Sequence, residues 1–281
     1  MADREPGVAD GQLRLGNLER LGGGREAEIF AIGEGRVLRL ARNRARAACI
    51  EREVAAMRAA RQAGAPVPAV YEQLELEGRP GMVIERLEGD DLLARLGKRP
   101  WSVRSVGRTL GRVHAQLHRV TAPAGLPSVR DELRRRLGSE LVPAAVRELA
   151  LARLAELPHG DRLCHGDLHP ANLLPAGSDY AVIDWPLGAR GHPAADVART
   201  CLLITGGVVP DDAPRVVRHL EAHGRRILLA AYLRGYRSEL ALDQALVKRW
   251  RPVCAAARLA EAIDGERGML LAEAGRRACP P

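Results

Sequence analysis

The sequence predicts an α+β fold in which a small antiparallel sheet with one helix precedes a larger, mostly helical part. Short apolar runs broken by glycines occupy residues 13–41 and return at residues 71–85, as is typical of antiparallel strands joined by turns. From Asp90 onward, apolar residues recur mainly at helical spacing. A chain of 281 residues that is 46% hydrophobic can bury a core in one large domain or in two lobes.

The start of the chain is predicted to alternate strands with glycine turns. Residues 1–12 are polar and are expected to form a loose tail. A strand at Leu18–Leu21 leads into three glycines at 22–24, and the runs 27–32 and 36–41 then form a hairpin. A glycine loop over a hairpin can turn backbone N–H groups toward phosphates, although a plain surface turn has the same composition.

The first helix is predicted at residues 44–62, where Gly64 and Pro66 end an Ala- and Arg-rich segment. Its inward face contains Glu53 among apolar residues, and a carboxylate in that position needs a partner or water. The apolar members of this face are Ile50, Val54 and Met57.

Two further hairpins are predicted. The first joins residues 71–76 to residues 81–85, and the chain then breaks at residues 86–89. The second joins residues 172–174 to residues 180–183 through a turn-forming segment rich in Pro, Gly, Ser and Asp.

Helices are predicted to fill the rest of the second part. They cover residues 102–120, residues 129–157 as one or two helices, residues 213–240 and residues 243–263. The Arg-rich positions of the second segment are interpreted as a solvated face. His114 and His118, four residues apart, have a spacing that suits a metal, but without a third ligand we interpret them as packing and surface residues.

Three oxygen-bearing side chains are predicted to meet near the last hairpin. Asn172 follows Asp167 by five residues, and Asp184 lies twelve residues further on. The hairpin returns Asp184 to the loop that carries the other two. Mg²⁺ prefers such hard oxygen ligands, so these residues form a candidate magnesium site.

The same residues resemble a kinase catalytic loop. Residues 165–172, HGDLHPAN, are similar to H-R-D-x-x-x-x-N, and residues 183–185, IDW, stand where kinases have D-F-G. An accidental triplet among solvated residues is the alternative, which the order and spacing of the whole set disfavour. Gly for Arg and Trp for Phe resemble the aminoglycoside phosphotransferase and choline kinase group of small-molecule kinases. The resemblance implies a bilobal protein-kinase-like fold, with an N-terminal nucleotide-binding lobe at residues 1–88 and a C-terminal catalytic and acceptor-binding lobe at residues 89–281.

The resemblance also implies roles in the catalytic loop. Asp167 is expected to accept the proton of the substrate hydroxyl, and Asn172 and Asp184 are expected to hold Mg²⁺. His169 stands where many protein kinases have a phosphate-contacting Lys, so it is expected to donate to the γ-phosphate. A structural loop histidine is the alternative.

On the nucleotide side, the chain departs from the family pattern. The strand Lys that pairs with a helix Glu corresponds to Arg39, and the helix residue corresponds to Glu53. The chain contains only two lysines, Lys98 and Lys248, so Arg39 is expected to contact the phosphates in place of Lys. An ordinary strand arginine beside a solvated Glu is the alternative.

The remaining nucleotide contacts are also implied by resemblance. The carbonyl of Glu85 and the N–H of Leu87 are expected at the adenine edge, with Ile84 behind the base and Val37 above it. Gly23 and Gly24 are expected near the phosphates. ATP is the expected nucleotide, and Ile84 alone does not exclude GTP.

The segment after Asp184 separates this chain from protein kinases. Only eleven residues lie between Asp184 and Asp196, which leaves no room for a long phosphorylated activation segment. Residues 191–198 follow the motif G-x-P-x-x-D-x-A, which again resembles the small-molecule kinases, in which the aspartate at the position of Asp196 braces the catalytic loop. A simple helix cap is the alternative.

Composition argues against several other classes. The net charge of +8 is dispersed along the chain and only 3% of residues are aromatic, so a nucleic-acid partner is not expected. No apolar run approaches the ~18 residues of a membrane span, and the charged N-terminus has no signal-peptide core, so a cytoplasmic location is expected. Five cysteines without a C-x-x-C pair suggest neither a disulfide framework nor a zinc site. The oligomeric state stays open.

The predicted function is Mg²⁺-dependent transfer of the ATP γ-phosphoryl group to a hydroxyl of a small molecule. The resemblance implies aminoglycoside-like or amino-alcohol acceptors, with antibiotic resistance as a possible role. A cationic acceptor needs carboxylates, and Glu261 and Asp264 on the last long helix are candidates for an acidic lip; a solvated helix end is the alternative. The rival functions are a pseudokinase, supported by the missing Lys, and a basic nucleic-acid-binding protein.

Overall fold

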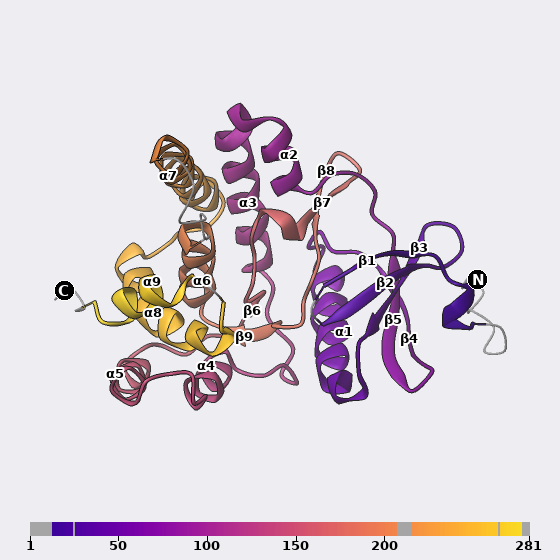
Figure 1. Ribbon diagram of the computed structural model, residues 1–281, viewed down its shortest axis with the longest axis horizontal. Helices are drawn as coiled ribbons and strands as arrows, with labels where there is room; N and C mark the ends of the chain where they lie inside the picture. Colours follow the sequence, from indigo (N-terminus) through magenta and orange to yellow (C-terminus); the bar gives the residue numbers. More distant parts are fainter. Residues whose placement is uncertain (1–12, 25, 207–214, 264, 277–281) are drawn as a thin grey trace.

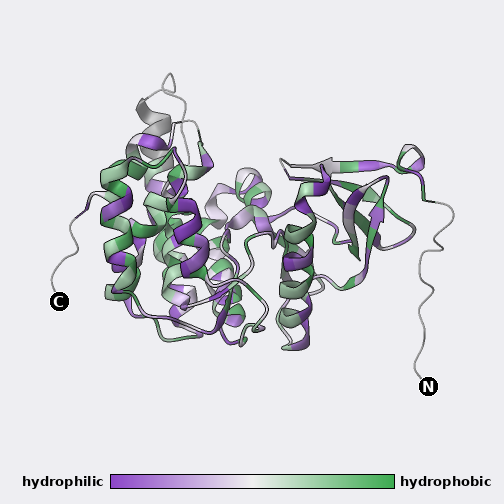
Figure 2. Ribbon diagram, turned by 90° about the horizontal axis from the view of Figure 1, so that it is seen from below, coloured by the Kyte–Doolittle hydropathy of each residue, from purple (hydrophilic) through white to green (hydrophobic). Residues whose placement is uncertain are grey.

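The computed structural model describes residues 13–24, 26–206, 215–263 and 265–276. An antiparallel sheet and one long helix lie on one side of the molecule, and a larger helical part lies on the other (Figure 1). Apolar residues gather on the faces where these helices contact one another (Figure 2). The predicted α+β arrangement is therefore confirmed.

The sheet has five antiparallel strands in the order β1-β2-β3-β5-β4. Residue Arg39 in the middle strand pairs with Met82, and Val37 pairs with Ile84. The hairpin over residues 70–85 turns at Glu77 and Gly78, which both have positive φ (51° and 75°). Because the turn takes only these two residues, the two strands are longer than the sequence predicted. The strands are β1 (Arg20–Gly23), β2 (Ala27–Ala31), β3 (Arg36–Ala41), β4 (Val70–Leu76) and β5 (Arg79–Glu85).

Helix α1 (Ala47–Gln62) packs on the sheet with the predicted face. Ile50, Val54 and Met57 are buried, and Glu53 is only 1% exposed. A short 3-10 turn, Arg44–Arg46, precedes the helix. The sequence thus places a carboxylate inside the fold, where it needs a cation.

The helical part contains helices in all the predicted ranges and three others. Its elements are α2 (Leu92–Lys98), α3 (Val103–Leu117), α4 (Val129–Leu137), α5 (Ala144–Ala155), α6 (Pro193–Gly206), α7 (Arg215–Arg237), α8 (Gln244–Arg258) and α9 (Arg267–Ala274). No range was predicted for α2, α6 and α9; α2 and α9 are short, with 7 and 8 residues. A 3-10 turn, Pro100–Ser102, joins α2 to α3.

Helices α3 and α7 approach each other closely. A Cβ atom on Gly111 of α3 would lie 2.1 Å from the Tyr232 carbonyl oxygen of α7, so only glycine fits there. The same constraint applies at Gly235 of α7, where a Cβ would lie 2.3 Å from the Arg108 carbonyl oxygen of α3. This close packing brings Tyr232 and Tyr236 within reach of side chains on α3.

Two small strand pairs lie between the sheet and the helices. Strand β6 (Arg162–Cys164) pairs with β9 (Ala189–Gly191), and β7 (Leu173–Ala176) pairs with β8 (Asp179–Val182). The second pair is the predicted hairpin, which turns at Gly177 with a φ of 58°. The 3-10 turn Pro170–Asn172 leads into it.

One predicted helix is too long. Helix α8 ends at Arg258 and is followed by a 3-10 turn, Leu259–Glu261, and by Ala262 in the left-handed conformation (φ 49°). A left-handed residue is a common way to end a helix, because the chain then leaves the helix axis. Glu261 therefore does not lie on a long helix, and Asp264 lies outside the described residues.

Candidate active site

A large cleft separates the sheet from the helical part. Its volume is about 1290 Å³, which exceeds the roughly 300–1,000 Å³ of most single-ligand pockets and leaves room for two substrates. The predicted site residues that line it are Gly23, Gly24, Val37, Arg39, Glu53, Ile84, Glu85, Leu87, Asp167, His169, Asn172 and Asp184. The structure thus brings every predicted catalytic, metal and nucleotide residue to one cleft.

The loop that carries Asp167 is held by side chains of α6. The Asp196 carboxylate accepts the His165 N–H at 2.6 Å and the Gly166 N–H at 2.9 Å. The Thr200 hydroxyl donates to the Leu168 carbonyl at 3.0 Å. The predicted bracing role of Asp196 is confirmed.

Gly166 has a conformational reason to be glycine. Its φ is 80°, and a Cβ there would lie 2.9 Å from the Leu187 carbonyl oxygen. The loop can therefore pass against the segment after β8 only because residue 166 has no side chain.

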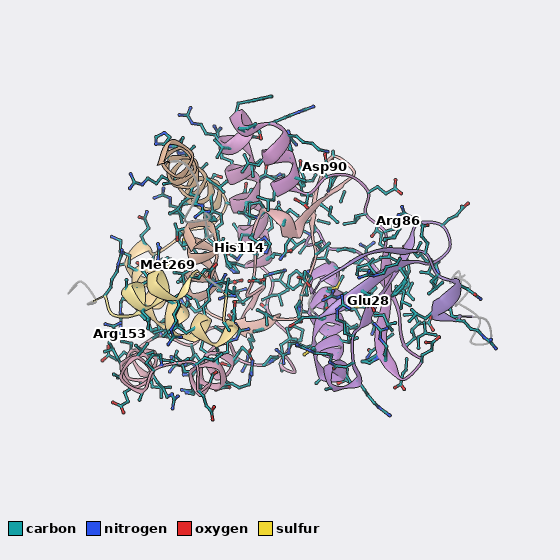
Figure 3. The ribbon with its side chains drawn as sticks, in the orientation of Figure 1. Glu28, Arg86, Asp90, His114, Arg153 and Met269 are labelled. Atoms are coloured by element: carbon teal, nitrogen blue, oxygen red, sulfur yellow. The ribbon has the colours of Figure 1, made fainter. Side chains whose placement is uncertain are left out.

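His114 and His118 are both buried, so the predicted packing role is confirmed and the predicted surface position is wrong. Asp196 is the third group beside them. Their Nε2 atoms lie 3.1 and 3.3 Å from an Asp196 oxygen, and their Nδ1 atoms lie 2.8 and 2.7 Å from the hydroxyls of Tyr232 and Tyr236. Figure 3 places His114 in the interior of the helical part. Although the three groups are close enough for a metal ion, their hydrogen bonds are already complete, so we interpret them as a structural brace.

Asp167 lies beside positive charge. Its Oδ1 accepts a hydrogen bond from Arg199 Nη2 at 3.1 Å. Burial raises the pKa of Asp167, but the charges of Arg199 and, less strongly, His169 outweigh burial and hold the pKa below its ordinary value. The group is therefore a carboxylate at neutral pH, as a proton acceptor must be.

His169 lies near the catalytic carboxylate without a hydrogen bond to it. Its Nε2 is 4.0 Å from Asp167 Oδ2. Burial lowers the pKa of His169, and the opposing charges of Asp167 and Asp184 do not offset burial. A neutral ring can donate one N–H, which is compatible with the predicted phosphate contact.

Asn172 and Asp184 fit the chemistry of a magnesium site. Asn172 Nδ2 donates to the Asp167 carbonyl at 3.0 Å, which leaves its amide oxygen without a hydrogen bond among the described residues. Asp184 follows β8 with a φ of 64° and a side chain that is 43% exposed, so its carboxylate is accessible from the cleft. Both offer the hard oxygen ligands that Mg²⁺ prefers.

Arg39 pairs with two carboxylates. Its Nε lies 2.9 Å from Glu53, and its Nη2 lies 2.9 Å from Asp184. Burial lowers the pKa of Arg39, but the charges of Glu53 and Asp184 outweigh burial and raise it above its ordinary value. Glu53 also accepts the Trp185 N–H at 3.1 Å. The predicted pair between Arg39 and Glu53 is present, and the exposed-arginine alternative is wrong.

The predicted adenine contacts lie at the end of β5. The Leu87 N–H donates to no acceptor in the described part of the chain, so it is available to a base. Val37 and Ile84 are buried and pair across β3 and β5. The Gly24 N–H, in contrast, donates to the Ala27 carbonyl at 2.9 Å and is not available to a phosphate in this conformation.

Three arginines with nearly buried side chains that line the cleft were missed from the sequence. Arg136 lies on α4 and was assigned to a solvated face, but its side chain is only 12% exposed. Arg199 and Arg258 lie in apolar stretches of α6 and α8, with side chains 9% and 7% exposed. The sequence feature that could have indicated Arg199 and Arg258 is a single arginine inside an apolar helix, because a buried charge needs partners.

The proposed acidic lip is also corrected. Glu261 lines the cleft, but its carboxylate contacts Arg136 at 2.6 Å, Arg199 at 2.7 Å and Arg258 at 2.9 Å. It is therefore part of an ion-pair cluster and not a free carboxylate for a cationic ligand.

The two lobes, the braced loop, the Arg39–Glu53 pair and the contact of Arg39 with Asp184 across the cleft define a kinase-like phosphotransferase architecture. A family model described as the phosphotransferase enzyme family matches residues 17–244. The chain therefore belongs to this family, and the resemblance noted in the sequence is confirmed.

Solved structures support the same fold. The chain is similar to a choline/ethanolamine kinase family protein from Mesorhizobium loti, with a TM-score of 0.57 and 20% identity over 92% of this chain and 86% of that one. An aminoglycoside-3'-phosphotransferase of type VIII gives a TM-score of 0.61 and 20% identity over 85% and 93%. The amicoumacin kinase hAmiN, solved with AMP-PNP, Ca²⁺ and Ami, gives 0.61 and 17% over 92% and 87%. The predicted bilobal protein-kinase-like fold is confirmed.

Among curated proteins, the chain is 31% identical over 177 residues to the mouse (Mus musculus) acyl-CoA dehydrogenase family member 10. The match covers 54% of this chain and 16% of that protein, so the chain corresponds to a small part of that relative. Within the described residues, no helix combines the length and the apolar character needed to cross a membrane.

Proposed function

We propose that this protein transfers the γ-phosphoryl group of ATP to a hydroxyl group of a small molecule, with Mg²⁺ as the metal. The acceptor oxygen forms a bond to the γ-phosphorus, and the bond from that phosphorus to the bridging oxygen breaks, with the electron pair leaving on ADP. The hydroxyl proton passes to the Asp167 carboxylate. The convergence of Asp167, Asn172 and Asp184 with the Arg39–Glu53 pair in one cleft carries this proposal.

Each residue has a positioning or electrostatic task. Asp167 offers its unbonded oxygen to the acceptor hydroxyl, and Asn172 and Asp184 are the residues that would hold Mg²⁺. The ion, when bound, supplies charge neutralisation on the phosphates. Arg39, fixed by Glu53, presents a guanidinium to the same phosphates.

The acceptor class that we propose to test first is a hydroxylated amine, because the family resemblance implies aminoglycoside-like antibiotics and amino alcohols. Glu261 supplies no unpaired carboxylate for such an amine, so the ammonium group has to bind elsewhere in the cleft. An ATP-consumption screen over aminoglycosides, amino alcohols, sugars and nucleosides identifies the class. Activity confined to neutral sugars or nucleosides would remove the amine proposal and keep the kinase chemistry.

The first prediction tests the proton acceptor. Asp167→Asn keeps the shape of the side chain but removes its basicity, so turnover should fall by roughly 10²-fold or more. Nucleotide binding should survive, because Asp167 is not assigned to the nucleotide. Turnover is measured as acceptor-dependent ADP release, and binding is measured by titration with ATP and Mg²⁺. Near-normal turnover in this variant would exclude Asp167 as the base.

A second candidate function is a pseudokinase that binds nucleotide without turnover. The observation that favours it is the arginine at position 39, where the family resemblance implies a lysine. ATP binding without ADP release, across the whole acceptor screen, would support this candidate over the enzyme.

A further inference from the structure

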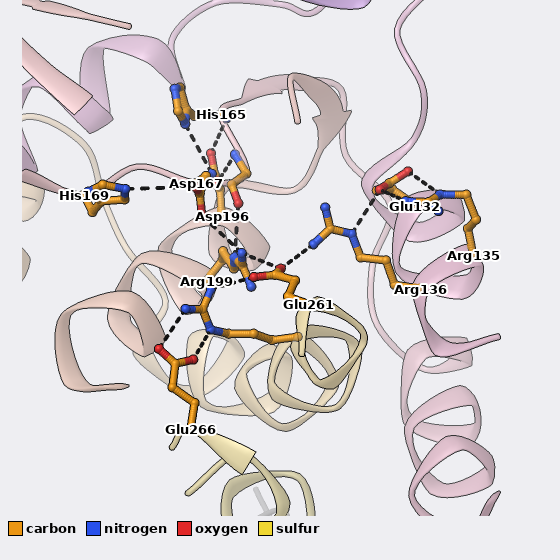
Figure 4. Close-up of polar contacts among 12 residues, drawn as sticks. Glu132, Arg135, Arg136, His165, Asp167, His169, Asp196, Arg199, Glu261 and Glu266 are labelled. Atoms are coloured by element: carbon orange, nitrogen blue, oxygen red, sulfur yellow. Dashed lines mark hydrogen bonds and ion pairs between the residues drawn. The ribbon is translucent and has the colours of Figure 1, made fainter. Parts of the chain in front are cut away.

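The two oxygens of the Asp167 carboxylate have different surroundings. Oδ1 lies 3.1 Å from Arg199 Nη2, and Arg199 Nε also donates to the Gly166 carbonyl at 3.2 Å (Figure 4). Oδ2 is 4.0 Å from His169 Nε2, beyond hydrogen-bond range. One oxygen is therefore held by Arg199, and the other is left for an acceptor hydroxyl.

Arg199 is itself fixed on both sides. Its side chain is only 9% exposed, and a guanidinium in such a place needs carboxylates around it. The Nη2 atom that contacts Asp167 also lies 2.7 Å from Glu261 Oε1. The Arg199 side chain cannot turn away from Asp167 without also leaving Glu261.

Glu261 is held by two further elements. Arg136 of α4 donates to its Oε1 at 2.6 Å, and Arg258 at the end of α8 donates to its Oε2 at 2.9 Å. Arg258 is clamped in turn by both oxygens of Glu266, directly before α9, at 2.6 and 2.9 Å. An unbroken chain of ion pairs thus connects the α8–α9 corner to Arg199.

We propose that Arg199 is a positioning residue that fixes the orientation of the Asp167 carboxylate, and that Glu261 holds Arg199 for this task. The proposal rests on the proposed function, because it takes Asp167 as the proton acceptor. A displacement of about 1 Å in a reacting group can cost on the order of 10²-fold in rate. The α8–α9 corner therefore contributes to catalysis through the Arg199 guanidinium.

The test compares kcat with KM in two variants of Arg199. Arg199→Gln removes the guanidinium and should lower kcat for acceptor phosphorylation by about 10- to 100-fold, with little change in KM for ATP or acceptor. Arg199→Lys keeps one charged donor and should recover part of kcat. A raised acceptor KM with an unchanged kcat in Arg199→Gln would overturn the proposal, because Arg199 would then bind the acceptor directly.

The role of Glu261 is tested by a double-mutant cycle. Glu261→Gln should lower kcat by about tenfold, and Arg199→Gln with Glu261→Gln should be no slower than Arg199→Gln alone, because both act through one contact. Additive losses would overturn the role of Glu261. The matched control is Arg251→Gln, which breaks the 2.9 Å ion pair between α8 and Glu273 of α9 and should keep wild-type kcat.

A structural readout separates this proposal from the proposed function. Crystal structures of the wild type and of Arg199→Gln should show one Asp167 rotamer in the first and several in the second, whatever the activity. A single unchanged rotamer in Arg199→Gln would overturn the positioning role even if the protein is a kinase. If Arg199→Gln does not fold, Glu261→Gln answers the same question.

Discussion

Arg39 places a planar guanidinium where the family resemblance implies an ammonium. Its Nε lies 2.9 Å from Glu53 Oε1 and 3.0 Å from Glu53 Oε2, and its Nη2 donates to Asp184 Oδ1 at 2.9 Å. A lysine concentrates its charge at one atom on a flexible stem, so it cannot hold two carboxylates in this fixed relation. The side chain of Arg39 therefore fixes both the helix carboxylate and the candidate metal ligand.

This arrangement predicts the behaviour of variants at position 39. Arg39→Lys keeps the charge and should retain measurable turnover, whereas Arg39→Ala leaves Glu53 buried without its cation and should raise KM for ATP and lower kcat. Glu53→Ala should act through the same pair, so the double variant Arg39→Ala with Glu53→Ala should lose less activity than the sum of the two single losses, expressed as free energies. Steady-state kinetics with varied ATP measures all three variants. Strictly additive effects would contradict cooperation, and Arg58→Ala, exposed on α1 and outside the cleft, is the control.

The sequence predicted the residues of the catalytic loop but not the arginines around it. Asp167, Asn172 and Asp184 lie in one local motif, whose hairpin fixes their relation. Arg199 depends on Glu261, 62 positions further on, and no local pattern indicates such a pair. The buried arginine in an apolar helix predicts only that some partner exists.

Helix α6 is the element that holds the catalytic loop, and α3 and α7 hold α6. The sequence predicted the Asp196 brace from a local motif. It did not predict the Tyr–His pairs behind Asp196, because these depend on the close approach of α3 and α7 at Gly111. The end of a helix was likewise predictable only where glycine or proline ends it. Helix α8 ends instead at Arg258, whose side chain pairs with Glu266, and the chain then turns at the left-handed residue Ala262.

The brace predicts a pH dependence of stability. Burial lowers the pKa of His118 from 6.5 to about 4, with His114 acting in the same direction and Asp196 opposing. Tyr236 is the other group that faces the ring. Between pH 6.5 and 4 the unfolded chain binds a proton that the folded protein does not bind. The free energy of unfolding should therefore fall as pH is lowered through this window, by about 3 kcal/mol from this residue.

Urea unfolding between pH 4.5 and 7 measures the slope of the free energy of unfolding against pH. Each group that binds a proton only in the unfolded chain contributes about one proton to this slope. Burial also lowers the pKa values of His165, His169 and His192, which therefore contribute in the same direction. The comparison with His118→Gln isolates the contribution of His118. In His118→Gln this slope should decrease by the contribution of one proton, roughly 1.4 kcal/mol per pH unit. The control is His159→Gln, which makes the same substitution at an exposed histidine. An unchanged slope in His118→Gln would mean that His118 does not titrate differently on folding.

At the scale of the whole molecule, contacts between the lobes gather around the end of β8 and the segment that follows it. The Pro66 carbonyl accepts the Val182 N–H at 2.8 Å, and Glu53 accepts the Trp185 N–H at 3.1 Å. The connection between β5 and α2, residues 86–91, is a second link. The proposed lobe boundary at residue 88 lies in this connection. Whatever binds at Asp184 therefore touches a segment that contacts both lobes.

Metal-dependent nucleotide binding should thus stabilise the molecule as a whole. A ligand at about 100 times its Kd adds roughly 2.7 kcal/mol to the free energy of unfolding, which corresponds to about 5 °C in Tm for a chain of this size. ATP with Mg²⁺ should give this shift in the wild type, and ATP with a chelator should give less. In Asp184→Ala the two shifts should be equal, because the charged ligand for the ion is missing. Asp179→Ala is the control: this residue lies on the same hairpin, 2.7 Å from Arg112 and outside the cleft, and should keep the Mg²⁺-dependent increment. A full increment in Asp184→Ala would show that the ion binds elsewhere.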